Sequence, residues 1–261
     1  MRGAPEGVTG LENSNVYDDA RRAETYARLE FPGTYHLAYR DLPQIISRHA
    51  RGRRALDFGC GTGRSTRFLR RLGFEAVGVD IAADMIRLAR ELDPAGDYRL
   101  TADGDFGQFA DRSFDLVLSV FTFDNIPTGT RKAAIFSELA RLLAPGGCVV
   151  SVVSAPEIYV NEWASFSTKD FPENRQAVAG DKVRIIITDT EDPRPVEDVV
   201  WPDAAYREVY AAAGLEAVEV LKPLATGKEP YAWVSETRIA PWVIYVLKRS
   251  AAGRPGRPPG R

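Results

Sequence analysis

The sequence predicts an α/β protein built on a doubly wound, mostly parallel sheet with helices on both faces. Short apolar runs alternate with helical stretches between residues 55 and 153, and this alternation is typical of parallel strand–helix–strand units. A glycine-rich turn, Gly59–Gly63, follows the first apolar run, which is where sheets of this kind bind ligands.

Composition and length are those of an ordinary globular protein. Of the 261 residues, 44% are hydrophobic and 27% are charged, and the formal net charge of −2 gives no overall attraction to nucleic acid. No stretch approaches the roughly 20 apolar residues of a membrane span, and the N-terminus lacks the apolar centre of a signal peptide. Since Cys60 and Cys148 are the only cysteines, we predict a cytoplasmic protein without a disulfide framework.

The order of the elements can be written from the periodicity. Residues 1–14 and 250–261 are expected to be disordered, and the domain to occupy residues 15–249. Two amphipathic patterns, over residues 15–29 and 35–50, predict helices separated by a break. The strands that follow are expected at 55–58, 76–81, 98–102, 114–121 and 148–153, with helices at 65–72, 83–92 and 130–143.

This alternation stops after Ser154 and resumes near Trp201. We interpret residues 155–200 as an insertion that covers the carboxyl ends of the strands, where ligands of α/β sheets bind. Within it, residues 182–189 and 195–201 are expected to pair as a hairpin. A helix over 202–213 and strands over 216–221 and 240–248 are expected to complete the sheet.

The glycine turn has the spacing G-x-G-x-G within the stretch ALDFGCGTGRST, residues 55–66. It departs from the dinucleotide pattern G-x-G-x-x-G because Arg64 occupies the last position, and from the phosphate-binding pattern because no lysine follows. About twenty residues further on, Asp80 ends the next strand, where a carboxylate can accept hydrogen bonds from both hydroxyls of a ribose. Turn and carboxylate together predict a nucleoside site.

Three segments carry a resemblance to a known family. LDFGCGTGRST, VGVDIAADMI and SFDLVLSVFTFDNI resemble successive motifs of class I S-adenosylmethionine-dependent methyltransferases, over roughly residues 50–155. The resemblance implies a Rossmann-like sheet with an antiparallel last strand, a helical lid over residues 15–50 and S-adenosylmethionine as cofactor. It implies a small-molecule methyl acceptor, no metal, no membrane partner, and a monomer or homodimer.

The same resemblance implies a set of cofactor contacts. Gly59 and Gly61 would bring backbone against the aminoacyl part, Asp57 would engage the ammonium group, and Asp80 would bind the ribose. The remaining residues implied to bind the adenine, the methionine portion or the carboxylate of the cofactor are Tyr17, Ile81, Met85, Asp103, Gly104 and Phe121.

Several of these residues also have a purely structural interpretation. Asp57 can instead cap the turn that follows it, and Met85 and Phe121 can belong to the core. Asp105, two residues beyond Asp103, can take the place of that residue beside the adenine. These alternatives remain open at the level of the sequence.

The methyl-acceptor side is less defined. His36 has an ordinary pKa that suits a general base near neutral pH, and Tyr35 beside it is a second candidate, although His36 can equally be a lid residue with a satisfied hydrogen bond. Asp124 can orient an amine or hydroxyl group, or cap a turn. Aromatic residues of segments 157–174 and 228–237 can line a pocket for a planar acceptor or form a small core of their own.

We therefore predict a methyltransferase that acts on an oxygen or nitrogen atom of a small aromatic or apolar metabolite. The alternative is a protein that binds the same cofactor without methyl transfer, either as a regulator or as a non-methylating enzyme. A nucleotide-dependent oxidoreductase is disfavoured by Arg64. Because no Asn-Pro-Pro-Tyr-like tetrapeptide and no basic surface interleaved with aromatic residues is found, nucleic-acid substrates are not expected.

Overall fold

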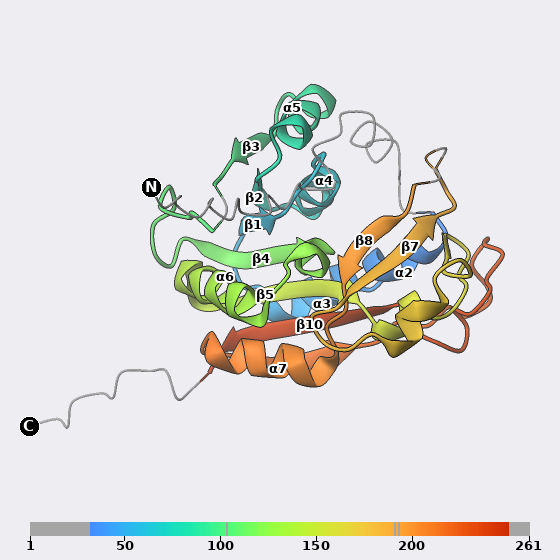
Figure 1. The fold of residues 1–261 in the computed structure, drawn as a ribbon. Helices are drawn as coiled ribbons and strands as arrows, with labels where there is room; N and C mark the ends of the chain where they lie inside the picture. Colours follow the sequence, from blue (N-terminus) through green and yellow to red (C-terminus); the bar gives the residue numbers. More distant parts are fainter. Residues whose placement is uncertain (1–31, 103, 191, 193, 251–261) are drawn as a thin grey trace, which may run out of the picture.

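The central sheet has the predicted architecture (Figure 1). The structure is a computed structural model that describes residues 32–102, 104–190, 192 and 194–250. Seven strands pair in the order β3-β2-β1-β4-β5-β10-β9, and β10 is antiparallel to both neighbours while the other adjacent pairs are parallel. The strands are β1 Arg54–Phe58, β2 Glu75–Asp80, β3 Asp97–Leu100, β4 Phe114–Val120, β5 Leu143–Ser154, β9 Leu215–Leu221 and β10 Trp242–Arg249.

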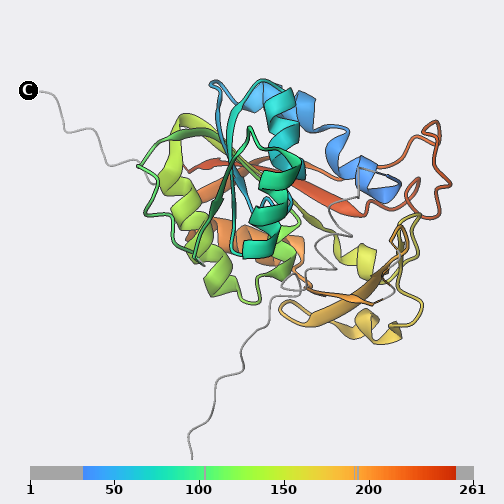
Figure 2. The same cartoon turned by 90° about the horizontal axis from the view of Figure 1, so that it is seen from above.

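Helices cover both faces of this sheet (Figure 2). On one face, the helices α3 and α4 pack with residues such as Leu116 and Val150; on the other, α6 and α7 pack with Val117 and Val149. Central strands buried on both sides explain why the sequence shows continuous apolar runs rather than alternation. The helices are α2 Thr34–Tyr39, α3 Leu42–His49, α4 Arg64–Arg71, α5 Ala83–Leu92, α6 Gly129–Leu142 and α7 Asp203–Ala212.

The predicted helix over residues 35–50 is in fact two helices. Helix α2 ends at Tyr39 and α3 begins at Leu42, with Pro43 in its first turn. A continuous helix would place the ring of Pro43 against the carbonyl of Tyr39 and remove one backbone hydrogen bond, so the chain breaks there. Residues 1–31 and 251–261 lie outside the described residues, and with them the helix expected over residues 15–29, the expected disorder over residues 1–14 and, except for residue 250, that over residues 250–261.

The insertion forms a small sheet of its own, in the order β6-β7-β8. Its strands are β6 Phe166–Ser167, β7 Lys182–Ile187 and β8 Val196–Val199, and the antiparallel pairing of β7 with β8 confirms the expected hairpin. The short 3-10 turn η2 Pro156–Tyr159 connects β5 of the main sheet to it, and a second, η3 Pro172–Gln176, lies between β6 and β7. The small sheet lies beyond the carboxyl ends of β4 and β5 (Figures 1 and 2).

No helix within the described ranges combines the length and the apolar character that crossing a bilayer requires.

Candidate functional site

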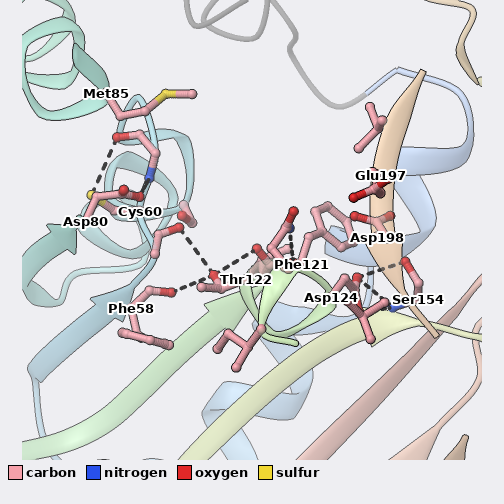
Figure 3. A pocket seen from close by; sticks show the side chains of 18 of the residues that line it. Phe58, Cys60, Asp80, Met85, Phe121, Thr122, Asp124, Ser154, Glu197 and Asp198 are labelled. Carbon is pink, nitrogen blue, oxygen red and sulfur yellow. Dashed lines mark hydrogen bonds between the residues drawn. The ribbon is translucent and has the colours of Figure 1, made fainter. Parts of the chain in front are cut away.

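A cavity of about 650 Å³ lies at the carboxyl ends of β1, β2, β4 and β5, beneath the strands β7 and β8 of the insertion. Its position follows from the topology, because the chain order of the strands reverses between β1 and β4, and α/β sheets open a crevice at such a point. The glycine turn and Asp80 line one end, and the aromatic and acidic side chains of the other end include Phe121 and Asp124 (Figure 3).

The glycine turn connects β1 to α4, and two of its glycines serve different purposes. Both have a positive φ, +72° at Gly59 and +52° at Gly61, which favours glycine. A Cβ atom at Gly59 would collide with the Thr122 side chain, so this glycine permits close packing within the protein. A Cβ atom at Gly61 would meet no protein atom within 4 Å. Gly61 therefore has open space beside its backbone, and it lines the cavity.

Asp80 holds the glycine turn in place from the end of β2. Its Oδ2 accepts a hydrogen bond of 2.8 Å from the backbone N–H of Gly61, and its Oδ1 accepts one of 2.9 Å from Ala82. The carboxylate also lines the cavity. The predicted pairing of Asp80 with the glycine turn is thus present in the structure, while its contact with a ribose remains a prediction.

Asp57 lies beneath the turn and is completely buried. Its Oδ2 accepts hydrogen bonds from the hydroxyls of Ser65 (2.7 Å) and Thr66 (2.6 Å), whereas its Oδ1 is buried without a hydrogen-bond partner in the described part of the chain. Burial raises the pKa of Asp57 to about 6. Because Asp57 is not among the residues that line the cavity, the geometry favours the alternative in which it ties the turn to the start of α4.

The other predicted cofactor residues that are described all line the cavity, most of them at the same end and Phe121 at the aromatic end. Ile81, which is 48% exposed, and the buried Met85 line it, as does Gly104. Tyr17 and Asp103 lie outside the described residues. The alternative to Asp103, Asp105, accepts a hydrogen bond from the N–H of Gly107 and does not line the cavity.

Arg64 is a cavity residue that the sequence analysis used only as an argument against a dinucleotide. Its guanidinium lies 5.5 Å from the ring centre of Tyr35 and 5.9 Å from that of Tyr39, and all three side chains line the cavity. Arg64 is the first residue of α4, directly after the glycine turn. This position beside the turn is the sequence signal from which Arg64 could have been predicted to line the cavity. Burial raises the pKa of Tyr39 to about 12.

The helix α2 also explains why only one of its two predicted catalytic residues faces the cavity. Tyr35 and Tyr39 are four residues apart and lie on the same side of the helix, toward the cavity. His36 lies about 100° around the helix from Tyr35, does not line the cavity, and has its ring 5.5 Å from that of Tyr231. Of these two candidates for the general base, Tyr35 lines the cavity and His36 does not, and the catalytic role of either residue remains a prediction.

Four aromatic rings form a wall at the far end of the cavity. The ring centre of Tyr35 lies 5.0 Å from Phe166, 5.9 Å from Phe121 and 6.1 Å from Trp242. Phe121 has a φ of +64° at the turn from β4 into the 3-10 turn η1, Thr122–Asn125. Segment 157–174 thus contributes both to the lining of the cavity, through Phe166 and Tyr159, and to the interior of the insertion, through the buried Trp163 and Phe171.

Segment 228–237 serves the structure instead. The described residues that line the cavity include none from this segment. Glu236 is completely buried and accepts hydrogen bonds from the Thr34 hydroxyl (2.6 Å) and from the N–H of Ala164 (2.7 Å). It therefore joins α2 to the insertion.

Asp124 lies in η1, is only 3% exposed and lines the aromatic end of the cavity. Its carboxylate accepts hydrogen bonds from the Ser154 backbone N–H (3.0 Å) and hydroxyl (2.8 Å). Burial raises the pKa of Asp124 to about 6. Asp124 thus lines the cavity, and its hydrogen bonds join η1 to the end of β5; the side chain that caps the following helix, α6, is Thr128.

Lys132, on α6, lies behind η1 and is completely buried. Its Nζ donates a hydrogen bond to the carbonyl of Phe123 and lies 5.0 Å from the ring centre of Trp201 and 5.6 Å from that of Tyr206. Burial lowers the pKa of Lys132 to about 8, and the negative charges of Asp124 and Asp198 oppose this effect.

Asp198 brings a second carboxylate to this end of the cavity, from β8 (Figure 3). It accepts a hydrogen bond of 3.0 Å from the Tyr159 hydroxyl. Beside it in the sequence, Glu197 forms an ion pair of 2.6 Å with Lys182, and both of these side chains are largely exposed. The sequence analysis missed Asp198 because only the folding of the insertion onto η1 brings the two together.

A family match adds to this geometry. Residues 56–151 match the family described as Methyltransferase domain. They include the glycine turn, Asp80 and η1. Over these residues the chain is similar to a methyltransferase domain. This match confirms the resemblance seen in the sequence, and S-adenosylmethionine is the cofactor of the class that the sequence resembles.

Curated proteins similar to the methyltransferase domain match it over a limited length. A demethylmenaquinone methyltransferase of Tropheryma whipplei is 38% identical over 113 residues, which are 42% of this chain and 45% of that protein. A ubiquinone biosynthesis O-methyltransferase of Xanthomonas oryzae is 35% identical over 100 residues, 37% of this chain and 41% of that protein. The match thus spans less than half of the length of these relatives.

Among solved structures, the CcbJ methyltransferase of Streptomyces caelestis superimposes with a TM-score of 0.61 at 18% identity, over 88% of this chain and 96% of that one. This likeness extends beyond the methyltransferase domain to most of the described chain and confirms the Rossmann-like fold. At that identity it carries no information about the methyl acceptor.

Proposed function

We propose that this protein is an S-adenosylmethionine-dependent methyltransferase that acts on an oxygen or nitrogen atom of a small, aromatic or apolar molecule. The observation that carries the proposal is a single cavity with two unlike ends. One end joins a glycine turn to Asp80, and the other places the buried Asp124 among aromatic rings.

The residues at the first end fit the cofactor chemically. The open space at Gly61 admits a ligand against the backbone, and the Asp80 carboxylate suits the two hydroxyls of a ribose. Ile81 and Met85 offer apolar surface for the adenine. Arg64 would provide a cation for the carboxylate of the methionine portion, a role that does not require Asp57 to touch the ligand. When bound, the cofactor supplies an electrophilic methyl group on a sulfonium.

The residues at the second end would hold and prepare the methyl acceptor. Tyr35, Phe121 and Trp242 provide flat apolar surface and exclude water, so that the nucleophile is held in contact with the methyl group. Asp124 faces the same space and would orient the nucleophile and take its proton. A carboxylate whose pKa has risen to about 6 is a better base than an ordinary aspartate, and it remains mostly ionised at pH 7.

A protein that only binds the cofactor would need the first end of the cavity alone. The buried, hydrogen-bonded carboxylate at the second end is costly to keep, and its exposure to the cavity favours transfer to a second molecule. This observation is why we propose the transferase rather than the binding protein.

The test begins with calorimetric titration of S-adenosylmethionine, S-adenosylhomocysteine and NAD into the purified protein. We expect binding of the first two and none of NAD. A panel of phenols and amines is then incubated with labelled S-adenosylmethionine, and labelled product and S-adenosylhomocysteine are quantified. Binding of NAD instead, or of neither nucleoside, would overturn the proposed cofactor. Binding of the cofactor without turnover of any compound would favour the binding protein.

A further inference from the structure

We infer that the methyl acceptor carries an aliphatic group beside a planar ring, and that Ile185 and Val196 of the insertion set the length of that group. This inference deepens the proposed function and rests on it. Its basis is the order of aromatic and aliphatic side chains along the face of the β7–β8 hairpin that lines the cavity.

The hairpin has two unlike faces. Side chains alternate along a strand, so Ile185 and Ile187 of β7 share one face, and both are buried and line the cavity. Arg184, between them, lies on the opposite face, is exposed and forms an ion pair with Glu173. The polar face is thus turned to water and the aliphatic face to the cavity, as in antiparallel sheets that are covered on one side.

The face that lines the cavity changes in character along the strands. Ile187 is the register partner of Phe166, whose ring belongs to the aromatic wall. Ile185, two residues earlier, is the register partner of Val196, and both side chains are buried and line the cavity. Two residues of a strand advance by roughly 7 Å. An aliphatic surface of about that depth therefore adjoins the aromatic wall.

The 3-10 turn η2 closes this region from a second side. Ile158 of η2 is 2% exposed and lines the cavity, and η2 packs against β7. We call the region bounded by Ile158, Ile185 and Val196 the aliphatic compartment. A polar group placed against these three side chains would give up hydrogen bonds to water and gain none from them. A hydrocarbon group would instead gain the free energy of leaving water.

The aliphatic compartment lies beside the place where the methyl group would be transferred. β8, which carries Val196, packs against η1, which carries Asp124. An acceptor that lies with its ring against the aromatic wall and its nucleophile toward Asp124 therefore extends its other substituent toward the hairpin. With carbon–carbon bonds of about 1.5 Å, the depth of the compartment corresponds to a chain of roughly four to six carbon atoms.

The end of the compartment is suited to set a length limit. Ile185 and Val196 are β-branched, so their side chains have few alternative rotamers, and both are held in a paired hairpin. A ligand chain that is too long therefore meets a fixed surface. Val183, two residues before Ile185 on the same face of β7, is buried but does not line the cavity. The limit thus lies at Ile185 and Val196.

The experiment measures how binding depends on chain length. The full chain is saturated with S-adenosylhomocysteine and titrated by calorimetry with 4-alkylphenols from 4-methylphenol to 4-octylphenol. The corresponding 4-alkylanilines are titrated in parallel, because the inference does not depend on which nucleophile is methylated. We expect the affinity to rise about fourfold for each methylene group that enters the compartment, and to rise no further beyond about four to six carbon atoms.

Substitutions at Val196 should move the length limit in opposite directions. Val196→Ala should extend the rise in affinity by about one carbon atom and Val196→Ile should shorten it by about one, because close-packed sites respond to single methylene groups. Val196→Ile keeps the β-branched shape, so the test remains decisive if Val196→Ala does not fold. Val183→Ala is the matched control, and its length limit should equal that of the wild type.

The outcomes separate this inference from the proposed function. If S-adenosylhomocysteine does not bind to the wild type, the proposed function fails and this inference falls with it. If S-adenosylhomocysteine binds but the affinity of both series is independent of chain length, or no member of either series binds, the aliphatic compartment alone is overturned. A length limit that is the same in the wild type and in the folded variants of Val196 overturns the assignment of that limit to the hairpin.

Discussion

The open space at Gly61 gives the most selective test of the cofactor site. We expect Gly61→Ala to impair binding of S-adenosylhomocysteine because the added methyl group enters space that the protein itself leaves empty. Gly59 offers no such test, since a side chain there would collide with Thr122 before any ligand is present. Gly61→Ala therefore isolates the contact between the turn and a ligand.

The expected magnitude has two parts. Gly61 has a φ of +52°, and an alanine in that region costs roughly 1–2 kcal/mol of stability. Crowding of a ligand by one methyl group costs a further amount of about 1–3 kcal/mol, which corresponds to a loss of roughly 5- to 150-fold in affinity. The first part appears in the free energy of unfolding and the second only in the Kd for the ligand.

Gly214 provides the matched control. It follows α7, is exposed, has a φ of +69°, and a Cβ atom there would likewise meet nothing within 4 Å. Urea denaturation should therefore show similar destabilisation for Gly61→Ala and Gly214→Ala, while calorimetry should show weakened S-adenosylhomocysteine binding for Gly61→Ala alone. Equal affinity of both variants and the wild type would refute the assignment of the turn to the cofactor.

Three further changes test other parts of the site. Arg64→Gln should weaken S-adenosylhomocysteine by about 1.5–3 kcal/mol but leave binding of 5′-methylthioadenosine, which lacks the carboxylate, nearly unchanged; equal losses for both ligands in calorimetry would contradict the assigned role. Because the folded pKa of Asp57 is raised to about 6, its protonation stabilises the folded state fully below about pH 4 and this contribution is lost as the pH rises through 6. The free energy of unfolding of Asp57→Asn, measured relative to that of the wild type, should therefore rise by on the order of 3 kcal/mol between pH 4 and pH 7. If urea titrations give the same difference between the two proteins at both pH values, this role of Asp57 is excluded. Lys132→Met removes a cation that holds the pKa of Asp124 down, so the acid limb of kcat/KM should move to higher pH, whereas an unmoved limb would show that Asp124 is not the titrating base.

Local sequence patterns were sufficient to predict the sheet and the first end of the cavity. Apolar runs, helical periodicity and the spacing from Gly59 to Asp80 all act within one strand–helix–strand unit, where chain connectivity restricts the possible geometries. The register of β1 with β2, which pairs Phe58 with Val79, follows from that connectivity. The turn and Asp80 therefore meet as predicted.

The second end of the cavity depended on the tertiary structure. Asp198 reaches Asp124 only because β8 folds back over η1, a contact between segments far apart in the sequence that no local pattern encodes. His36 and Tyr35 are neighbours in the chain, yet the rotation of α2 directs only Tyr35 to the cavity. The sequence by itself determined the fold and the glycine turn with its carboxylate, since these follow from local periodicity and connectivity. The tertiary structure decided which charged side chains line the aromatic end of the cavity, because long-range packing of the insertion sets them.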